Sequence, residues 1–164
     1  MSWCLYDAAN SAFPTVVTTF VFGAYYTQAI AKTPEEGAAD WGLAVGLAAI
    51  AVAVAGPVLG AIADQGGRQK PWLAGFTALC VAATALLWFA TPEPGSSIWA
   101  LSFVALALFA FELGMVFYNA MLPGLAPIAY LGRVSGWGWG CGYIGGLSCL
   151  ALGLVGFVQT DTPW

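Results

Sequence analysis

The chain has 164 residues, of which 60% are hydrophobic and 7% charged, whereas soluble domains average roughly 45–50% and 25%. This composition excludes an ordinary water-soluble globule, and the net charge of −4 leaves no basic patch for binding nucleic acid. Since the sequence has no histidine, His-based catalytic triads and His-ligated metal sites are excluded as well.

Five stretches of mostly apolar residues are long enough to cross a bilayer, which needs about 20 residues per helix. In chain order they are 8–30, 41–63, 72–91, 98–120 and 134–158. Eleven of the twelve charged residues fall in or beside the connections between these spans, because charge is costly to bury in hydrocarbon, and Glu112 is the exception. We therefore predict an all-α, polytopic membrane protein with one transmembrane domain over residues 1–164.

The orientation of the spans follows from the Lys and Arg residues in the short loops, which stay on the cytoplasmic side of a membrane. Arg68, Lys70 and Arg133 fall on the same side as the N-terminus, and Lys32 falls opposite. The N-terminus is therefore predicted to be cytoplasmic. It lacks the basic segment and cleavage site of a signal peptide, so we expect none.

Polar side chains recur along the first span at steps of three and four residues, which place them on one face of a helix. One interpretation is that their hydroxyls bond carbonyls of their own helix or of a neighbour. The other is that the face lines a polar path for a solute. The candidate path residues on this span are Asn10, Ser11, Thr15, Thr18 and Tyr25.

The fourth span contains an acid, Glu112, with Asn119 seven residues later on the same face. A carboxylate inside a membrane must be protonated, paired or in contact with water. We predict that Glu112 and Asn119 also belong to the path, and that Glu112 is a candidate group for coupling transport to protons. The alternative is a structural hydrogen bond from a neutral Glu112 to a neighbouring helix.

Glycines at four-residue spacing are typical of helices that pack closely in membranes. They form two pairs on the second span and a ridge on the fifth: Gly42 with Gly46, Gly56 with Gly60, and Gly138, Gly142 and Gly146. We predict that these positions are helix–helix contacts. Pro14 and Pro57 are expected to kink the first and second spans.

The four cysteines form no CxxC pair, and the closest two lie eight residues apart, about 12 Å along a helix. We expect inert thiols. No nucleophile and base stand at a spacing that suits catalysis. The sequence therefore predicts no enzyme, no cofactor and no metal site.

Three strings resemble known transporters. The connection after the second span, GAIADQGGRQK at 60–70, is similar to the loop between the second and third helices of major facilitator superfamily transporters. The strings YDAANSAF at 6–13 and FYNAMLP at 117–123 resemble the autophagy-related vacuolar amino-acid effluxer family and its bacterial relatives. The resemblance covers nearly the whole chain.

This resemblance implies a secondary active transporter that works by alternating access, with eukaryotic members associated with amino-acid export from the vacuole. It implies that the first and fourth helices line the central cavity. It also implies a cytoplasmic gate in the loop, formed by Gly60, Asp64, Gly67, Arg68 and Lys70. The superfamily has two six-helix halves, so five spans predict part of the N-terminal half.

The expected partners are the lipid bilayer, a small solute such as an amino acid, protons, and either a missing C-terminal half or other copies of the chain. The expected location is the inner membrane of a bacterium or the vacuolar membrane of a fungus. A second hypothesis is a truncated membrane scaffold that no longer transports, or a helical bundle that forms oligomers.

Overall fold

The computed structural model describes residues 2–66 and 69–158, and every regular element in this part of the chain is a helix. Four of the described segments are long and apolar enough to cross a membrane, namely 34–62, 69–89, 94–124 and 128–156. The chain forms two compact units, one made of residues up to 24 together with those from 126 onward, the other of residues 25–125. The all-α, multi-pass prediction is confirmed, and the single transmembrane domain stays a prediction.

The first predicted span is divided into short helices rather than forming one long α-helix. In order they are α1 (Ser2–Asn10), η1 (Pro14–Phe20), α2 (Phe22–Tyr25) and η2 (Tyr26–Ile30), of which η1 and η2 are π-helices. The change from α to π geometry comes at Pro14, whose ring leaves no N–H for the preceding turn. The disruption predicted at this proline is therefore present.

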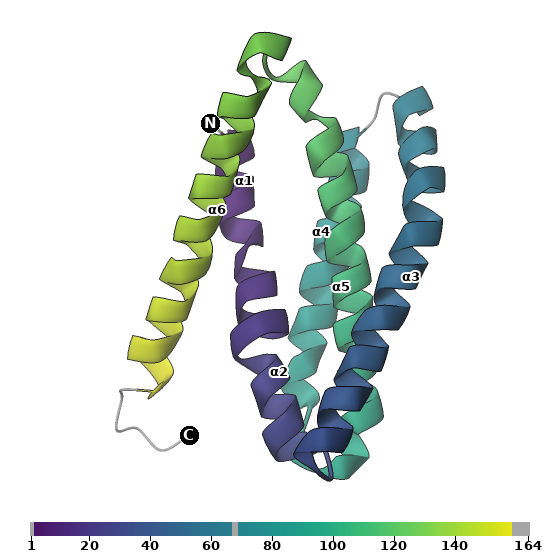
Figure 1. Cartoon of the computed structure of the whole chain (residues 1–164), viewed down its shortest axis with the longest axis vertical. Coiled ribbons are helices and arrows are strands. Elements are labelled where there is room, and N and C mark those ends of the chain that lie inside the picture. The colour runs from purple at the N-terminus through teal and green to yellow at the C-terminus, as the bar shows by residue number, and fades with distance from the viewer. Residues whose placement is uncertain (1, 67–68, 159–164) are drawn as a thin grey trace. The chain divides into compact units, whose positions relative to one another are not determined.

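In the unit that contains both ends of the chain, α1 lies side by side and parallel with α6 (Leu131–Gly153), which continues as η7 (Leu154–Val158) (Figure 1). The buried residues of α6 are Gly138, Gly142 and Gly146, which we call the glycine ridge. Gly145 lies beside it, and a Cβ added there would overlap the backbone carbonyl of Ala8. The predicted contact at these glycines is confirmed.

In the unit of residues 25–125, α5 (Ser97–Ala120) is the central helix. It packs against both α4 (Gln69–Leu86) and α3 (Pro34–Gly66), which barely touch each other. Residues of α5 that are fully buried include Ala100, Val104, Ala107, Ala110, Leu113 and Phe117. The short 3-10 turns η3 (Leu87–Phe89) and η4 (Pro94–Ser96) connect α4 to α5, and η5 (Leu122–Gly124) follows α5. The next turn, η6 (Ile128–Tyr130), precedes α6 in the other unit.

The two glycine pairs on α3 behave differently. A Cβ on Gly56 or Gly60 would lie 4.0 Å from Leu113 Cδ2 or 3.9 Å from Val116 Cγ1, so this pair faces α5 as predicted. A Cβ on Gly42 or Gly46 would meet no atom within 4 Å, so the predicted contact at this pair is wrong within the described structure. The helix also runs without interruption through Pro57.

Helix α3 begins seven residues earlier than the predicted span. Thr33 Oγ1 accepts the backbone N–H of Glu36 at 3.2 Å, and Pro34 occupies the first helical position. A threonine followed three residues later by glutamate is a capping signal, and proline is favoured at the first position. The hydropathy criterion missed this start because the first turns are polar.

Groups from four segments meet at one end of the same unit, in a cluster that we call the tyrosine anchor: Tyr25 and Tyr26, Trp41, Ser97 and the Ala90 carbonyl. Tyr26, which has no exposed surface, shares a 2.6 Å hydrogen bond with Ser97 Oγ, and its ring lies 5.8 Å from that of Trp41. Tyr25 Oη donates to the carbonyl of Ala90 at 3.3 Å. The tyrosine anchor therefore holds η2 against the starts of α3 and α5 and the turn after α4.

The contact of α1 with α6 generates a first prediction. Gly145→Ala should lower the free energy of unfolding by roughly 1–3 kcal/mol, because the new methyl would overlap the Ala8 carbonyl and force the helices apart. Thermal unfolding of the purified protein in detergent measures the change. Gly140→Ala is the matched control, since a Cβ there meets nothing within 4 Å and alanine favours a helix. Equal stabilities of the two variants would contradict the contact.

The tyrosine anchor generates a second prediction. Tyr26→Phe should cost about 1 kcal/mol of stability, because it removes the hydrogen bond with Ser97 and leaves the ring in place. A double-mutant cycle with Ser97→Ala should show that the two changes are not additive. Tyr143→Phe is the control, since that side chain is 66% exposed. Additive effects of the pair would argue against this hydrogen bond.

Candidate functional site

Polar residues of the first segment form a line that faces the glycine ridge. Asp7, Ser11 and Thr15 stand at four-residue steps. A Cβ added to Gly142 would lie 2.8 Å from Ser11 Oγ and 2.9 Å from Asp7 Oδ2, and one on Gly146 would lie 2.6 Å from Thr15 Oγ1. Side chains at these two positions of α6 would displace the polar line, so the glycines are what let it come this close.

The hydroxyls of this line are bonded within their own segment. Ser11 Oγ donates to the Asp7 carbonyl at 2.8 Å, Thr15 Oγ1 to the Ser11 carbonyl at 2.7 Å, and Thr18 Oγ1 to the Pro14 carbonyl at 2.7 Å. Asn10 is half-buried at the end of α1. The geometry agrees with the first of the two interpretations of these hydroxyls, and their place on a solute path stays a prediction.

Asp7 is a residue that sequence reasoning missed. It is 7% exposed and is the buried charged residue of the described chain. The hydropathy pattern begins the first span at residue 8, directly after Asp7, whereas α1 begins at Ser2 and includes Asp7. The signal was available, since Asp7 extends the series of Ser11 and Thr15 by one further step of four residues.

Tyr25 is part of the tyrosine anchor, which lies at a different end of the unit from Glu112. Its hydroxyl is bonded to the Ala90 carbonyl in the turn between α4 and α5. Glu112 lies fifteen residues beyond the start of α5 at Ser97, which is roughly 22 Å along the helix. The structure therefore does not bring Tyr25 and Glu112 together.

Glu112 and Asn119 lie on the uncovered face of α5. Both side chains are exposed, whereas Leu113 and Phe117 on the opposite face are fully buried against the neighbouring helices. No hydrogen bond or ion pair joins Glu112 to another residue in the described part of the chain. The alternative of a structural hydrogen bond to a neighbouring helix thus has no partner among those residues.

The predicted gate loop is described in part. Gly60 lies in α3 and faces Val116, and Lys70 is exposed in the first turn of α4. The side chain of Asp64 lies outside the described residues, as do Gly67 and Arg68. The gate function of this loop stays a prediction.

An apolar groove of about 340 Å³ runs along α4 and is lined by Pro71, Trp72, Gly75, Phe76 and Leu79. The rings of Trp72, Phe76 and Phe117 stack on one another beside it, with centroids 5.6 to 6.2 Å apart. The groove contains none of the predicted path residues and has no charged group. It is therefore not the polar path that the sequence predicts.

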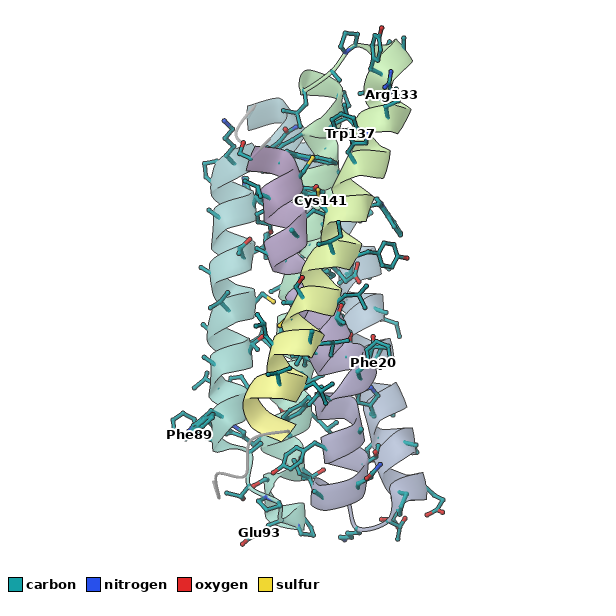
Figure 2. All side chains as sticks on the ribbon, turned by 90° about the vertical axis from the view of Figure 1, so that its left-hand side faces the viewer. Phe20, Phe89, Glu93, Arg133, Trp137 and Cys141 are labelled. Carbon is teal, nitrogen blue, oxygen red and sulfur yellow. The ribbon has the colours of Figure 1, made fainter. Side chains whose placement is uncertain are left out.

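The structure shows four free cysteines, of which Cys80 is buried and the other three are half-buried. Within residues 2–66 and 69–158, no three Asp, Glu, His or Cys side chains come close enough to hold a metal ion. Two polar features remain as candidates for a functional site. One is the line of Asp7, Ser11 and Thr15 in one unit, and the other is the exposed face with Glu112 and Asn119 in the other unit. Figure 2 shows that carbon makes up most of the side chains drawn on the helices.

Comparison with known proteins places this arrangement in a family. The model of the Major Facilitator Superfamily matches residues 1–148. The chain is also similar to the uncharacterized MFS-type transporter YxiO of Bacillus subtilis (strain 168), with 38% identity over 147 residues. These residues are 88% of this chain and 34% of the relative, so the chain spans about a third of the relative's length. No solved structure matches the chain. From the helical architecture and these two matches we conclude that the chain belongs to the Major Facilitator Superfamily.

Proposed function

We propose that the chain is the N-terminal part of a secondary active transporter that moves a small solute by alternating access, with Glu112 as the group that couples transport to protons. Membership of the superfamily supports a transporter rather than an enzyme. The observation that carries the proposal is Glu112 itself, an acid on the uncovered face of a helix that has no other charged residue.

An acid at this position has a physical cost. The segment that contains it has the length and hydropathy of a membrane span, and an ionised carboxylate facing lipid is strongly unfavourable. The side chain must therefore meet water, a solute or a proton on the face that α3 and α4 leave free. A helix with a purely structural role would be more stable with an apolar residue here.

The solute class follows from the polar groups on this face and from the resemblance to the vacuolar effluxer family. Glu112 offers one negative charge and Asn119 an amide two turns away. An amino acid carries an ammonium group that a carboxylate binds and a carboxylate that an amide N–H binds. We therefore propose a zwitterionic or neutral solute, with amino acids as the first candidates.

The remaining elements of the proposal come from the sequence. The excess of Lys and Arg on one side supports a cytoplasmic N-terminus. Gly60, Asp64, Gly67, Arg68 and Lys70 would then form a gate on the cytoplasmic side. Superfamily transporters pair two six-helix halves, so the solute path would be completed by segments beyond the helices described above.

The test is proton flux in proteoliposomes that contain the intact transporter and a pH-sensitive dye. A panel of neutral amino acids is added one at a time, and a transported one should change the internal pH. Glu112→Gln should abolish this solute-dependent proton flux, because an amide cannot take up a proton. It should also remove the pH dependence of uptake of the same radiolabelled amino acid.

The control is Glu93→Gln, which makes the same chemical change at an exposed side chain outside the membrane-spanning part of α5. It should leave both signals unchanged. Normal proton flux in Glu112→Gln would contradict the coupling role. Uptake of none of the amino acids by the wild-type protein would contradict the proposed solute class.

A further inference from the structure

Asp7 is buried in the contact between α1 and α6, and no described residue is a partner for its charge. Oδ2 approaches the backbone of α6 so closely that a Cβ on Gly142 would lie 2.9 Å from it. Among the described residues, no hydrogen bond or ion pair reaches the carboxylate. The nearby Ser11 hydroxyl donates to the Asp7 backbone carbonyl instead, at 2.8 Å.

The charged and titratable groups around Asp7 do not neutralise it. On α1 these groups are Cys4 and Tyr6, and on α6, which packs against α1, they are Arg133, Cys141, Tyr143 and Cys149. Arg133 is exposed and nine residues before Gly142, about 13 Å along the helix. Figure 2 shows Arg133 near the start of α6 and Cys141 well beyond it. The residues of α6 that face α1 are the uncharged glycines of the ridge.

The neutral acid is the more stable form of a carboxyl group in such a place. Burial of an ionised carboxylate without a cation costs far more than burial of the neutral acid, so the group retains a proton instead. Every fully enclosed side-chain oxygen in the described structure has a hydrogen-bond partner. Since the Asp7 carboxylate has none among the described residues, its oxygens are not fully enclosed, and the residue keeps 7% of its surface exposed.

We propose that Asp7 is a proton-binding site, protonated while α1 lies on the glycine ridge of α6 and ionised when the two helices separate. On ionisation the O–H bond of the carboxyl breaks, its electron pair stays on oxygen, and a water molecule takes the proton. Proton binding and helix contact then favour each other, because each stabilises the state that the other requires.

This site is separate from the coupling group of the proposed function. Asp7 and Glu112 belong to different compact units, and protonation of Asp7 needs no solute and no transport. If Glu112 plays no role in coupling, the proposal for Asp7 is unaffected. The test below therefore measures protonation and stability rather than uptake.

The experiment is infrared spectroscopy of the intact protein in lipid, comparing the wild type with Asp7→Asn. A protonated carboxyl has a C=O stretch that is separate from the bands of a carboxylate and shifts in heavy water. The difference spectrum at neutral pH should show the loss of one such band in Asp7→Asn. In the wild type the same band should disappear as the pH is raised.

Glu112→Gln is the matched control, because it removes one acid elsewhere and should leave the Asp7 band in place. Asp7→Asn should also fold, and it should unfold at a higher temperature than the wild type at neutral and alkaline pH, since an amide enters the contact without taking up a proton. As the pH rises above about 4, where the unfolded carboxyl ionises, the wild type should lose stability by up to about tenfold in the folding constant per pH unit, the limit for one linked proton.

Three results would overturn the proposal. The first is a difference spectrum without a protonated band. The second is failure of Asp7→Asn to fold while Asp7→Glu folds, which would mean that a negative charge is needed. The third is stability of the wild type that depends on sodium at fixed pH and is lost in Asp7→Asn, which would identify a metal-cation site.

Discussion

The close approach of α1 to the glycines of α6 is the constraint on which the unit containing both chain ends depends. Any side chain at Gly142, Gly145 or Gly146 would occupy space that α1 now fills. The contact joins residues that are more than 130 positions apart in the sequence, and it sets the parallel register of the two helices. It also encloses Asp7, and the Ser11 and Thr15 hydroxyls beside it bond to the backbone of their own segment.

Much of this fold could be predicted from the sequence, because membrane helices need length and hydropathy, and both are visible in one chain. The glycine spacing correctly predicted the ridge on α6. It failed at Gly42 and Gly46. Small residues allow another helix to pack closely, but they do not show whether a neighbouring helix is present. The π-helical turns of the first segment could not be predicted, because the apolar pattern of a π turn differs little from that of an α turn.

The candidate site was less accessible to sequence reasoning. Glu112 stands out because an acid within an apolar span is rare. Asp7 did not stand out, because the polar residues around it suggested that the first helix begins after Asp7. The hydroxyls of Ser11, Thr15 and Thr18 illustrate a further limit, since the same spacing serves a polar path and a set of bonds to the preceding turn. The structure shows these bonds, and the place of the three residues on a solute path stays a prediction.

The early start of α3 has a consequence at the membrane surface. The helix has 33 residues, about 50 Å at 1.5 Å per residue, whereas the hydrocarbon layer is about 30 Å thick. The polar first turns, with Glu35, Glu36 and Asp40, therefore stand in the headgroup layer on a rigid support that Thr33 caps. Negative charges fixed at this end of the helix favour cations over anions in the adjacent water.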